Sequence, residues 1–126
     1  MGVITIFCKQ LFAGETPTIF GAGEQVRDFI HVSDIAMGSY LAATSETHGD
    51  TFNIGTGIGT SVNEIGDILS ARINPAITPT HGPEQAGEPG DSIADIKHSR
   101  DVLGFDPRWK LTEKIDEAIE YNRPKD

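Results

Sequence analysis

Apolar residues recur at helical spacing in two long stretches of the chain. In residues 3–13 they return close to every third or fourth position, and Gly14 follows as a residue that commonly ends a helix. Residues 62–73 repeat this pattern behind Ser61 and Glu64, which form the Ser-x-x-Glu capping box typical of a helix start. Three further helices are expected from a Ser33 or Asp34 cap to about Thr44, from Asp95 to Leu103, and from a Thr112 cap over 113–121.

Short runs of β-branched and aromatic residues lie between these helices and predict strands. Residues 26–32 alternate in character directly after the glycine turn 21–24, and residues 18–20 and 51–54 are further strand candidates. The alternation of short strands with about five helices indicates an α/β fold, with α+β also open and no doubly wound pattern. Two shorter strands are expected at 77–80 and 93–96.

Length, charge and cysteine content narrow the class of protein. The length of 126 residues fits one domain covering 1–126. A net charge of −9 and a sequence pI near 4.7 disfavour nucleic acid and anionic membranes as partners, because an acidic surface repels both. The single cysteine, Cys8, excludes an internal disulfide, and its apolar surroundings indicate a buried, inert thiol. The first apolar stretch is too short to cross a bilayer and no basic export signal precedes it, so a cytoplasmic location is expected.

Arg27 is the sharpest candidate for chemistry, because it stands in an otherwise apolar strand pattern. A guanidinium offers a planar fork of donors that matches phosphate oxygens. The alternative is an internal ion pair, for example with Asp28 or Asp34. Asp34 and Asp95 stand at expected helix starts, where carboxylates offset the helix dipole, so neither is assigned to acid–base catalysis. The four histidines lack the spacing of metal ligands, and no metal site is expected.

Five segments carry recognisable motifs: GVITIF at 2–7, TIFGAGEQVRDFIHVSD at 18–34, TFNIGTG at 51–57, SVNEI at 61–65 and GEPGDSIADIKHSRDVLGFDPRW at 87–109. In this order and spacing they resemble segments of the extended short-chain dehydrogenase/reductase family, which holds NAD-dependent nucleotide-sugar epimerases and dehydratases. Within that family the resemblance is strongest to the UDP-sugar 4-epimerases, such as UDP-glucose 4-epimerase, and to the 4,6-dehydratases. It implies the C-terminal, nucleotide-sugar-binding portion of such an enzyme, without the NAD-binding Rossmann half.

The family's catalytic features have no counterpart in these segments. NAD(P) binding uses a glycine fingerprint between a strand and a helix, whereas GAGEQVRDF has its glycines before a strand and FNIGTGIG comes too late. The family's tyrosine base needs a lysine four residues later; Tyr40 is followed by Thr44, and Tyr121 and Lys125 lie at the C-terminus. We therefore expect no catalytic residue and no cofactor in this chain, with NAD bound only together with the missing half. Whether the chain is an enzyme stays open.

The resemblance also implies which residues bind the substrate. Arg27 would hold the diphosphate, and the strand of Thr18, Ile19 and Phe20 would lie along the nucleotide base, mainly through backbone hydrogen bonds. Val3 would belong to a helix start that covers the nucleotide. The alternatives are a plain edge strand for 18–20 and a core role for Val3.

The loop at 85–90 departs from the family pattern. Gln85 and Gly90 stand where family members carry arginines that clamp the diphosphate. Loss of one charge-assisted phosphate contact costs about 1.5–3 kcal/mol, roughly tenfold to a hundredfold in affinity. Glu88 matches an acid that contacts the ribose hydroxyls, with a solvated loop carboxylate as the alternative.

Together these features predict a domain that binds a nucleoside-diphosphate sugar, a UDP-sugar before others, and is not catalytic alone. The alternative is a decayed remnant that acts as a dimerisation or protein-interaction module. A homodimer or a separate Rossmann-type partner chain is expected, since strands at 28–32 and 51–54 would otherwise leave exposed sheet edges.

Overall fold

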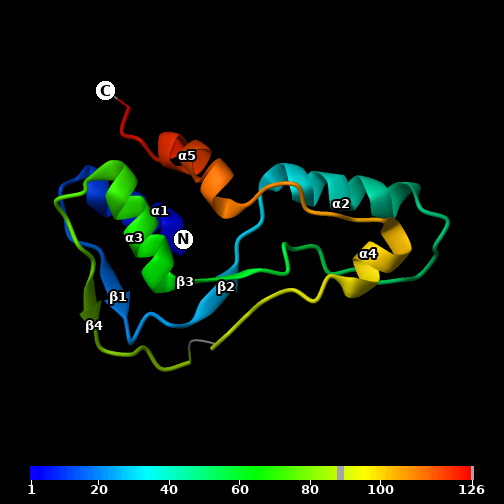
Figure 1. The fold of residues 1–126 in the computed structure, drawn as a ribbon, viewed down its shortest axis with the longest axis horizontal. Coiled ribbons are helices and arrows are strands. Elements are labelled where there is room, and N and C mark those ends of the chain that lie inside the picture. Colours follow the sequence, from blue (N-terminus) through cyan, green and yellow to red (C-terminus); the bar gives the residue numbers. More distant parts are fainter. Residues whose placement is uncertain (88–89, 126) are drawn as a thin grey trace.

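The computed structural model describes residues 1–87 and 90–125. Over these residues five helices are interspersed with four short strands, and the helices follow one another in the predicted order (Figure 1). This mixed α/β architecture confirms the predicted fold class. The helices are α1 (Val3–Phe12), α2 (Val32–Thr44), α3 (Val62–Ile73), α4 (Lys97–Leu103) and α5 (Leu111–Tyr121). The strands are β1 (Thr18–Phe20), β2 (Val26–Asp28), β3 (Gly59–Ser61) and β4 (Thr80–Gly82).

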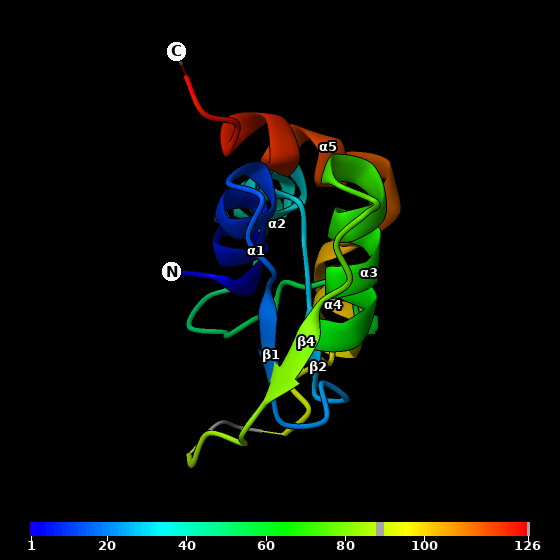
Figure 2. The same cartoon turned by 90° about the vertical axis from the view of Figure 1, so that its left-hand side faces the viewer.

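The main hydrophobic core lies where α1, α3 and α5 meet over β1 (Figures 1 and 2). Its members recur at three- and four-residue intervals along each helix, which is why the hydrophobic pattern predicted these helices. Tight packing of this kind makes each buried side chain costly to truncate. The buried members are Phe7, Cys8 and Leu11 on α1, Ile19 on β1, Ile65 and Leu69 on α3, and Ile115 and Ile119 on α5.

The helices α2 and α4 lie at the opposite end of the elongated molecule and contact each other (Figure 1). Ile54 packs so closely on Gly38 of α2 that a Cβ at this glycine would lie 2.8 Å from the isoleucine side chain. Ser99 of α4 is fully buried, and its Oγ donates a hydrogen bond to the carbonyl of Asn53. The extended segment around residue 54 therefore fastens the two helices together.

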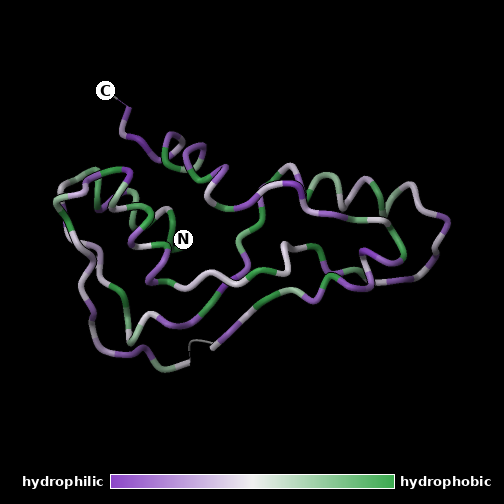
Figure 3. The backbone as a smooth tube through the Cα atoms, viewed as in Figure 1, coloured by the Kyte–Doolittle hydropathy of each residue, from purple (hydrophilic) through white to green (hydrophobic). Residues whose placement is uncertain are grey.

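The helix α2 also carries apolar side chains that the described residues leave exposed. Hydrophobic positions continue along α2, away from the main core (Figure 3). Val32 is 74% exposed and Tyr40 is 63% exposed, and Ile35 is exposed beside them in the sequence. Exposed apolar residues gathered on one element are typical of an interaction surface.

The strands form two separate two-stranded sheets. β1 pairs with β4 in parallel, with Thr18 opposite Thr80, and β2 pairs with β3 in antiparallel fashion, with Arg27 opposite Thr60. Figure 2 shows β1 and β4 side by side below α1 and α3. The predicted strand at 18–20 is therefore confirmed.

Several predicted strands are wrong in extent. The strand expected at 26–32 ends at Asp28, and no strand forms at 51–54 or 93–96, although Ser92 makes an isolated bridge with Arg27. A strand needs a partner for its backbone groups, and the described residues place none beside 29–31 or 51–54. The strand expected at 77–80 begins instead at Thr80, because Pro79 has no N–H to donate to a ladder.

Two predicted helix caps are also corrected. The cap of α2 is His31, whose ring Nδ1 accepts from the Ser33 amide at 3.3 Å, and not Ser33 or Asp34. The cap of α5 is Lys110 and not Thr112; its amide donates to Glu113 Oε2 at 2.7 Å. The capping box of Ser61 and Glu64 at α3 is confirmed.

Within the described part of the chain, no helix has both the length and the apolar content needed to cross a membrane.

Candidate functional site

A cavity of about 500 Å³ opens between α1, β1 and β2. Its wall combines the start of α1, the whole of β1, Arg27 of β2 with its flanking residues Gln25 and Phe29, the first residue of α3 and Gln85 of the loop after β4. Six of the seven predicted site residues line it, and the seventh, Glu88, lies outside the described residues. These six are Val3, Thr18, Ile19, Phe20, Arg27 and Gln85.

The strand β1 has one edge available to this cavity. Its strand partner among the described residues is β4, and a strand in a two-stranded sheet uses only one of its two edges for pairing. Gln25 Nε2 donates to the Phe20 carbonyl at 3.4 Å, near the end of β1. Phe20 is 41% exposed, whereas Ile19 is 2% exposed and belongs to the core. The strand therefore offers both backbone groups and an aromatic face to a ligand.

Arg27 is the one charged side chain among the described residues that line the cavity. Its Nη1 donates to the carbonyl of Val26 at 2.8 Å and also to the carbonyl of Gly90. These two contacts hold the guanidinium beside the loop that follows β4. The carboxylates of Asp28 and Asp34, two of the internal partners considered for Arg27, accept hydrogen bonds from backbone amides elsewhere.

An acidic rim adjoins the cavity. A second hollow of about 470 Å³ shares Phe20, Gln25 and Gln85 with it and is also lined by Glu24, Glu84 and Asp91. Carboxylates beside the cavity oppose an anionic ligand, and the neutral amide of Gln85 offers no charge to offset them. A diphosphate would therefore depend on Arg27 for its charge-assisted contact.

The other cavity residues could not be found from the sequence. Phe7 and Phe29 line the cavity and also pack in or against the main core, so their apolar spacing indicates only burial. Val62 is the first residue of α3, far away along the chain. Only tertiary packing brings these residues beside Arg27.

The predicted carboxylates have structural roles. Asp34 is 1% exposed, and its Oδ2 accepts from the amides of Arg108 and Trp109 at 3.1 and 3.2 Å. It therefore fastens the chain before α5 to α2, and it also lies in the first turn of α2, at the helix start where it was expected. Asp95 accepts from the Lys97 amide at 3.0 Å, so its role at the start of α4 is confirmed.

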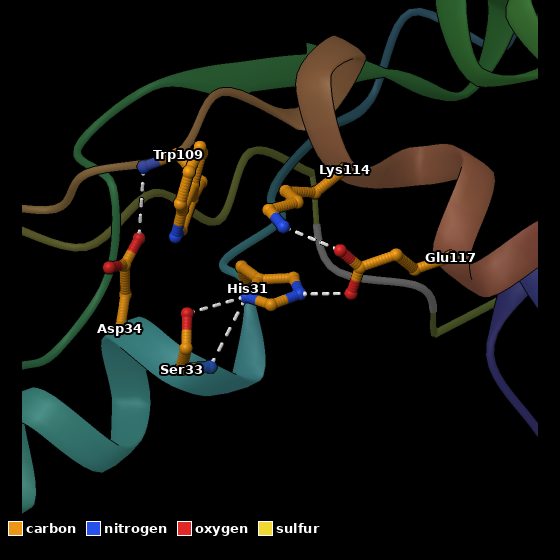
Figure 4. Close-up of polar contacts among 6 residues, drawn as sticks. All are labelled: His31, Ser33, Asp34, Trp109, Lys114 and Glu117. Atoms are coloured by element: carbon orange, nitrogen blue, oxygen red, sulfur yellow. Dashed lines mark hydrogen bonds and ion pairs between the residues drawn. The ribbon is translucent and has the colours of Figure 1, made fainter.

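A polar cluster joins α2 to α5 (Figure 4). His31 Nε2 lies 2.9 Å from Glu117 Oε2, and Lys114 Nζ lies 2.5 Å from the other oxygen. Lys114 also lies 4.3 Å from the ring centre of Trp109. The hydrogen bond from Lys114 and then that with His31 lower the pKa of Glu117. Lys114 and Glu117 are three residues apart on α5, but the sequence gives no signal for the contact with His31, which lies far away along the chain.

The described residues do not fit a dinucleotide cofactor or the family's base. Gly21 and Gly23 form the turn before β2, and residues 55–59 lead into β3, so neither stands between a strand and a following helix as a pyrophosphate loop requires. Tyr40 is on α2 with Thr44 four residues later, and Tyr121 is 87% exposed at the end of α5. No group of three or more possible metal ligands lies together in the described ranges.

Residues 1–55 match the family model described as NAD dependent epimerase/dehydratase family. Over 124 residues the chain is 34% identical to a UDP-glucose 4-epimerase of Mycolicibacterium smegmatis, with 98% of this chain and 40% of that protein covered. A putative UDP-glucose 4-epimerase of Methanocaldococcus jannaschii is 35% identical over 120 residues, with 95% and 38% covered. The chain thus spans about 40% of the length of the first of these relatives.

Solved structures give the same result. A UDP-glucose 4-epimerase of Thermotoga maritima, determined with UDP-glucose, superposes with a TM-score of 0.89 at 35% identity, covering 97% of this chain and 39% of that one. A UDP-N-acetylglucosamine 4-epimerase of Methanobrevibacter ruminantium, in complex with UDP-N-acetylmuramic acid, gives 0.86 at 32% identity, covering 95% and 38%.

The fold and these matches confirm the resemblance found in the sequence: the chain belongs to the NAD-dependent epimerase/dehydratase family. Within it the chain is similar to the UDP-glucose 4-epimerases, and the share of their length that it spans fits a C-terminal portion.

Proposed function

We propose that this chain is the nucleotide-sugar-binding portion of an NAD-dependent epimerase or dehydratase. A nucleoside-diphosphate sugar, a UDP-sugar before others, binds in the cavity between α1, β1 and β2. The observation that carries the proposal is the convergence of Val3, the β1 strand, Arg27 and Gln85 on one cavity. Its volume of about 500 Å³ falls in the range of about 300–1,000 Å³ typical of small-molecule sites.

The diphosphate and the base of the ligand each have a counterpart in this site. The diphosphate takes the charge-assisted hydrogen bonds of the Arg27 guanidinium. The base lies along the free edge of β1, where backbone groups and the Phe20 ring recognise it. The solved Thermotoga maritima relative, which was determined with UDP-glucose, supports the ligand class.

Calorimetric titration with UDP and UDP-glucose tests this function. We expect binding that is weak, because Arg27 is the one charged side chain on the described cavity wall. Arg27→Ala should abolish measurable heat, whereas Arg100→Ala, on α4 and paired with Asp106, should bind as the unaltered chain does. Absence of heat at millimolar UDP, or binding that survives Arg27→Ala, would refute the proposal.

Epimerisation or dehydration would need a catalytic, NAD-binding Rossmann half, in a longer chain or as a separate partner. The exposed apolar residues of α2 and the extended segments 29–31 and 51–54 form the surface on which such a half would dock. Turnover of a UDP-sugar only when that half and NAD are supplied is the expected result.

The exposed α2 residues also favour a second candidate function, a dimerisation or protein-interaction module. Val32 and Tyr40 would then be covered by another copy of the chain. Sedimentation velocity together with the UDP titration separates the two functions. A monomer at high micromolar concentration that binds UDP contradicts the interaction module. A dimer that binds no UDP supports it.

A further inference from the structure

The carboxylate of Asp28 holds three separate pieces of backbone together. It accepts hydrogen bonds from the Thr56 amide at 2.9 and 3.0 Å, from the Thr56 hydroxyl, from the Gly57 amide at 2.9 Å and from the Ala94 amide at 3.3 Å. Such saturation by donors is typical of a structural carboxylate and leaves it no role in proton transfer. Asp28 therefore joins β2 to the 56–57 turn and to the segment that follows residue 90.

Gly55 makes this close approach possible. A Cβ at this position would lie 2.6 Å from Asp28 Oδ2 and 2.5 Å from the Ala94 side chain. Contacts this short are essentially never tolerated, so the chain can pass here only as glycine. The clamp around Asp28 is built into the backbone of the 55–57 turn.

The same segment that Asp28 holds at Ala94 is held at its other end by Arg27. Ser92 lies beside β2 through two backbone hydrogen bonds. Its amide donates to the Val26 carbonyl at 3.0 Å, and its carbonyl accepts from the Asp28 amide at 3.1 Å. Two residues earlier, the Gly90 carbonyl accepts from Arg27 Nη1. Residues 90–94 are thus fastened to β2 by the side chains of two neighbouring residues.

We propose that Asp28 is a positioning residue for Arg27: it fixes residues 92–94 against β2 and so holds the Gly90 carbonyl where it orients the guanidinium toward the cavity. This inference rests on the proposed function, because Arg27 is taken to contact the diphosphate. Since a guanidinium on three flexible methylenes samples many rotamers, one fixed carbonyl acceptor reduces the conformations lost on binding.

Asp28→Asn tests the proposal, because an amide of the same shape cannot accept all these hydrogen bonds. Asp34→Asn is the matched control, a carboxylate that also accepts two backbone amides but fastens residues 108–109 to α2. We expect Asp28→Asn to weaken UDP binding about tenfold and Asp34→Asn to leave it unchanged. Because Arg27→Ala should itself leave no measurable binding, the effect of Asp28→Asn is measured in the chain that keeps Arg27.

A second readout does not depend on any ligand. The Nε–Hε resonance of Arg27 in ¹H–¹⁵N spectra should shift and sharpen with Asp28→Asn and stay in place with Asp34→Asn. If Asp28→Asn prevents folding, Thr56→Val, which deletes the hydroxyl donor to Asp28, takes its place with a smaller shift expected in the same direction.

The outcomes separate the two proposals. An unmoved Arg27 resonance, or equal losses of UDP affinity in Asp28→Asn and Asp34→Asn, overturns the positioning role even if UDP binds. Failure of UDP to bind any form refutes the proposed function, while a shifted Arg27 resonance in the same samples still supports the positioning role.

Discussion

His31 Nε2 lies 2.9 Å from Glu117 Oε2, and this contact joins the cap of α2 to the middle of α5 (Figure 4). The other imidazole nitrogen accepts from the Ser33 amide, so in the neutral ring Nε2 carries the proton and donates to Glu117. One side chain thus caps one helix and holds a second. Because α2 lies at one end of the molecule and α5 packs on the core, the contact couples the two ends.

Glu117→Gln should destabilise the chain in a pH-dependent way. The pKa of Glu117 is lowered by Lys114 and then by His31, so its contribution to stability is present above the ordinary value of 4.5 and is lost as pH falls through the lowered pKa. The unfolding temperatures of the two forms should therefore differ at about pH 7 and converge as the pH falls below the lowered pKa of Glu117.

Glu120→Gln is the control for this change, since Glu120 lies on the same helix and pairs with Arg123 at 2.8 Å, three residues away. Its effect should be smaller, because an exposed pair within one helix contributes about 0.3–0.5 kcal/mol. A difference in unfolding temperature between Glu117→Gln and the unaltered chain that stays constant across the pH range would contradict the assigned contacts of Glu117 with Lys114 and His31.

Cys8 should resist thiol reagents in the native chain. Burial raises its pKa from 9.0 to about 11, and the residue is 0% exposed. Any contribution to the free energy of unfolding from keeping the thiol neutral is present below pH 9.0, and it is lost as the pH rises through the raised pKa of about 11. At about pH 8 the thiolate fraction is roughly a hundredfold below that of the unfolded chain. Reaction with a chromogenic disulfide should be slow until guanidinium is added; fast native labelling would show that α1 opens readily.

Gly23→Ala should cost more stability than Gly14→Ala. Both glycines have left-handed backbone, with φ of 72° and 73°, so each substitution carries about 1–2 kcal/mol of backbone strain. At Gly14 nothing lies within 4 Å of the added methyl, but at Gly23 it would overlap Asn63 and lie 2.7 Å from Ile19 Cγ2. Urea unfolding measures the difference, and equal losses would show that Asn63 moves aside freely.

Gln85→Arg should strengthen UDP binding. Gln85 is exposed on the cavity wall, so an arginine there can reach a diphosphate without displacing the core. One added charge-assisted contact corresponds to roughly tenfold to a hundredfold in affinity. Thr47→Arg adds the same charge on an exposed loop and should change affinity little. A gain shared equally by both variants would indicate net charge rather than a contact at the site.

Much of the fold was predictable from local chemistry. The helix α3 followed from the Ser61–Glu64 capping box and its apolar spacing, and the end of α1 followed from Gly14. Arg27 stood out as a charged residue in an apolar run, and the structure places it on the cavity wall. The segment 51–54 was misassigned because β-branched content favours a strand only when a partner strand is present.

The sequence by itself determined the helices and their order, the family, and the candidate binding residues, because periodicity, caps and motifs are local properties of the chain. Only the tertiary structure decided which groups contact and restrain these side chains and segments. The Gly90 carbonyl meets Arg27, Asp28 fastens Ala94 and the 56–57 turn, and His31 meets Glu117, each between residues that lie far apart in the sequence. Hydrogen bonds depend on distance in space, and the packing of α1, α3 and α5 over β1 sets those distances.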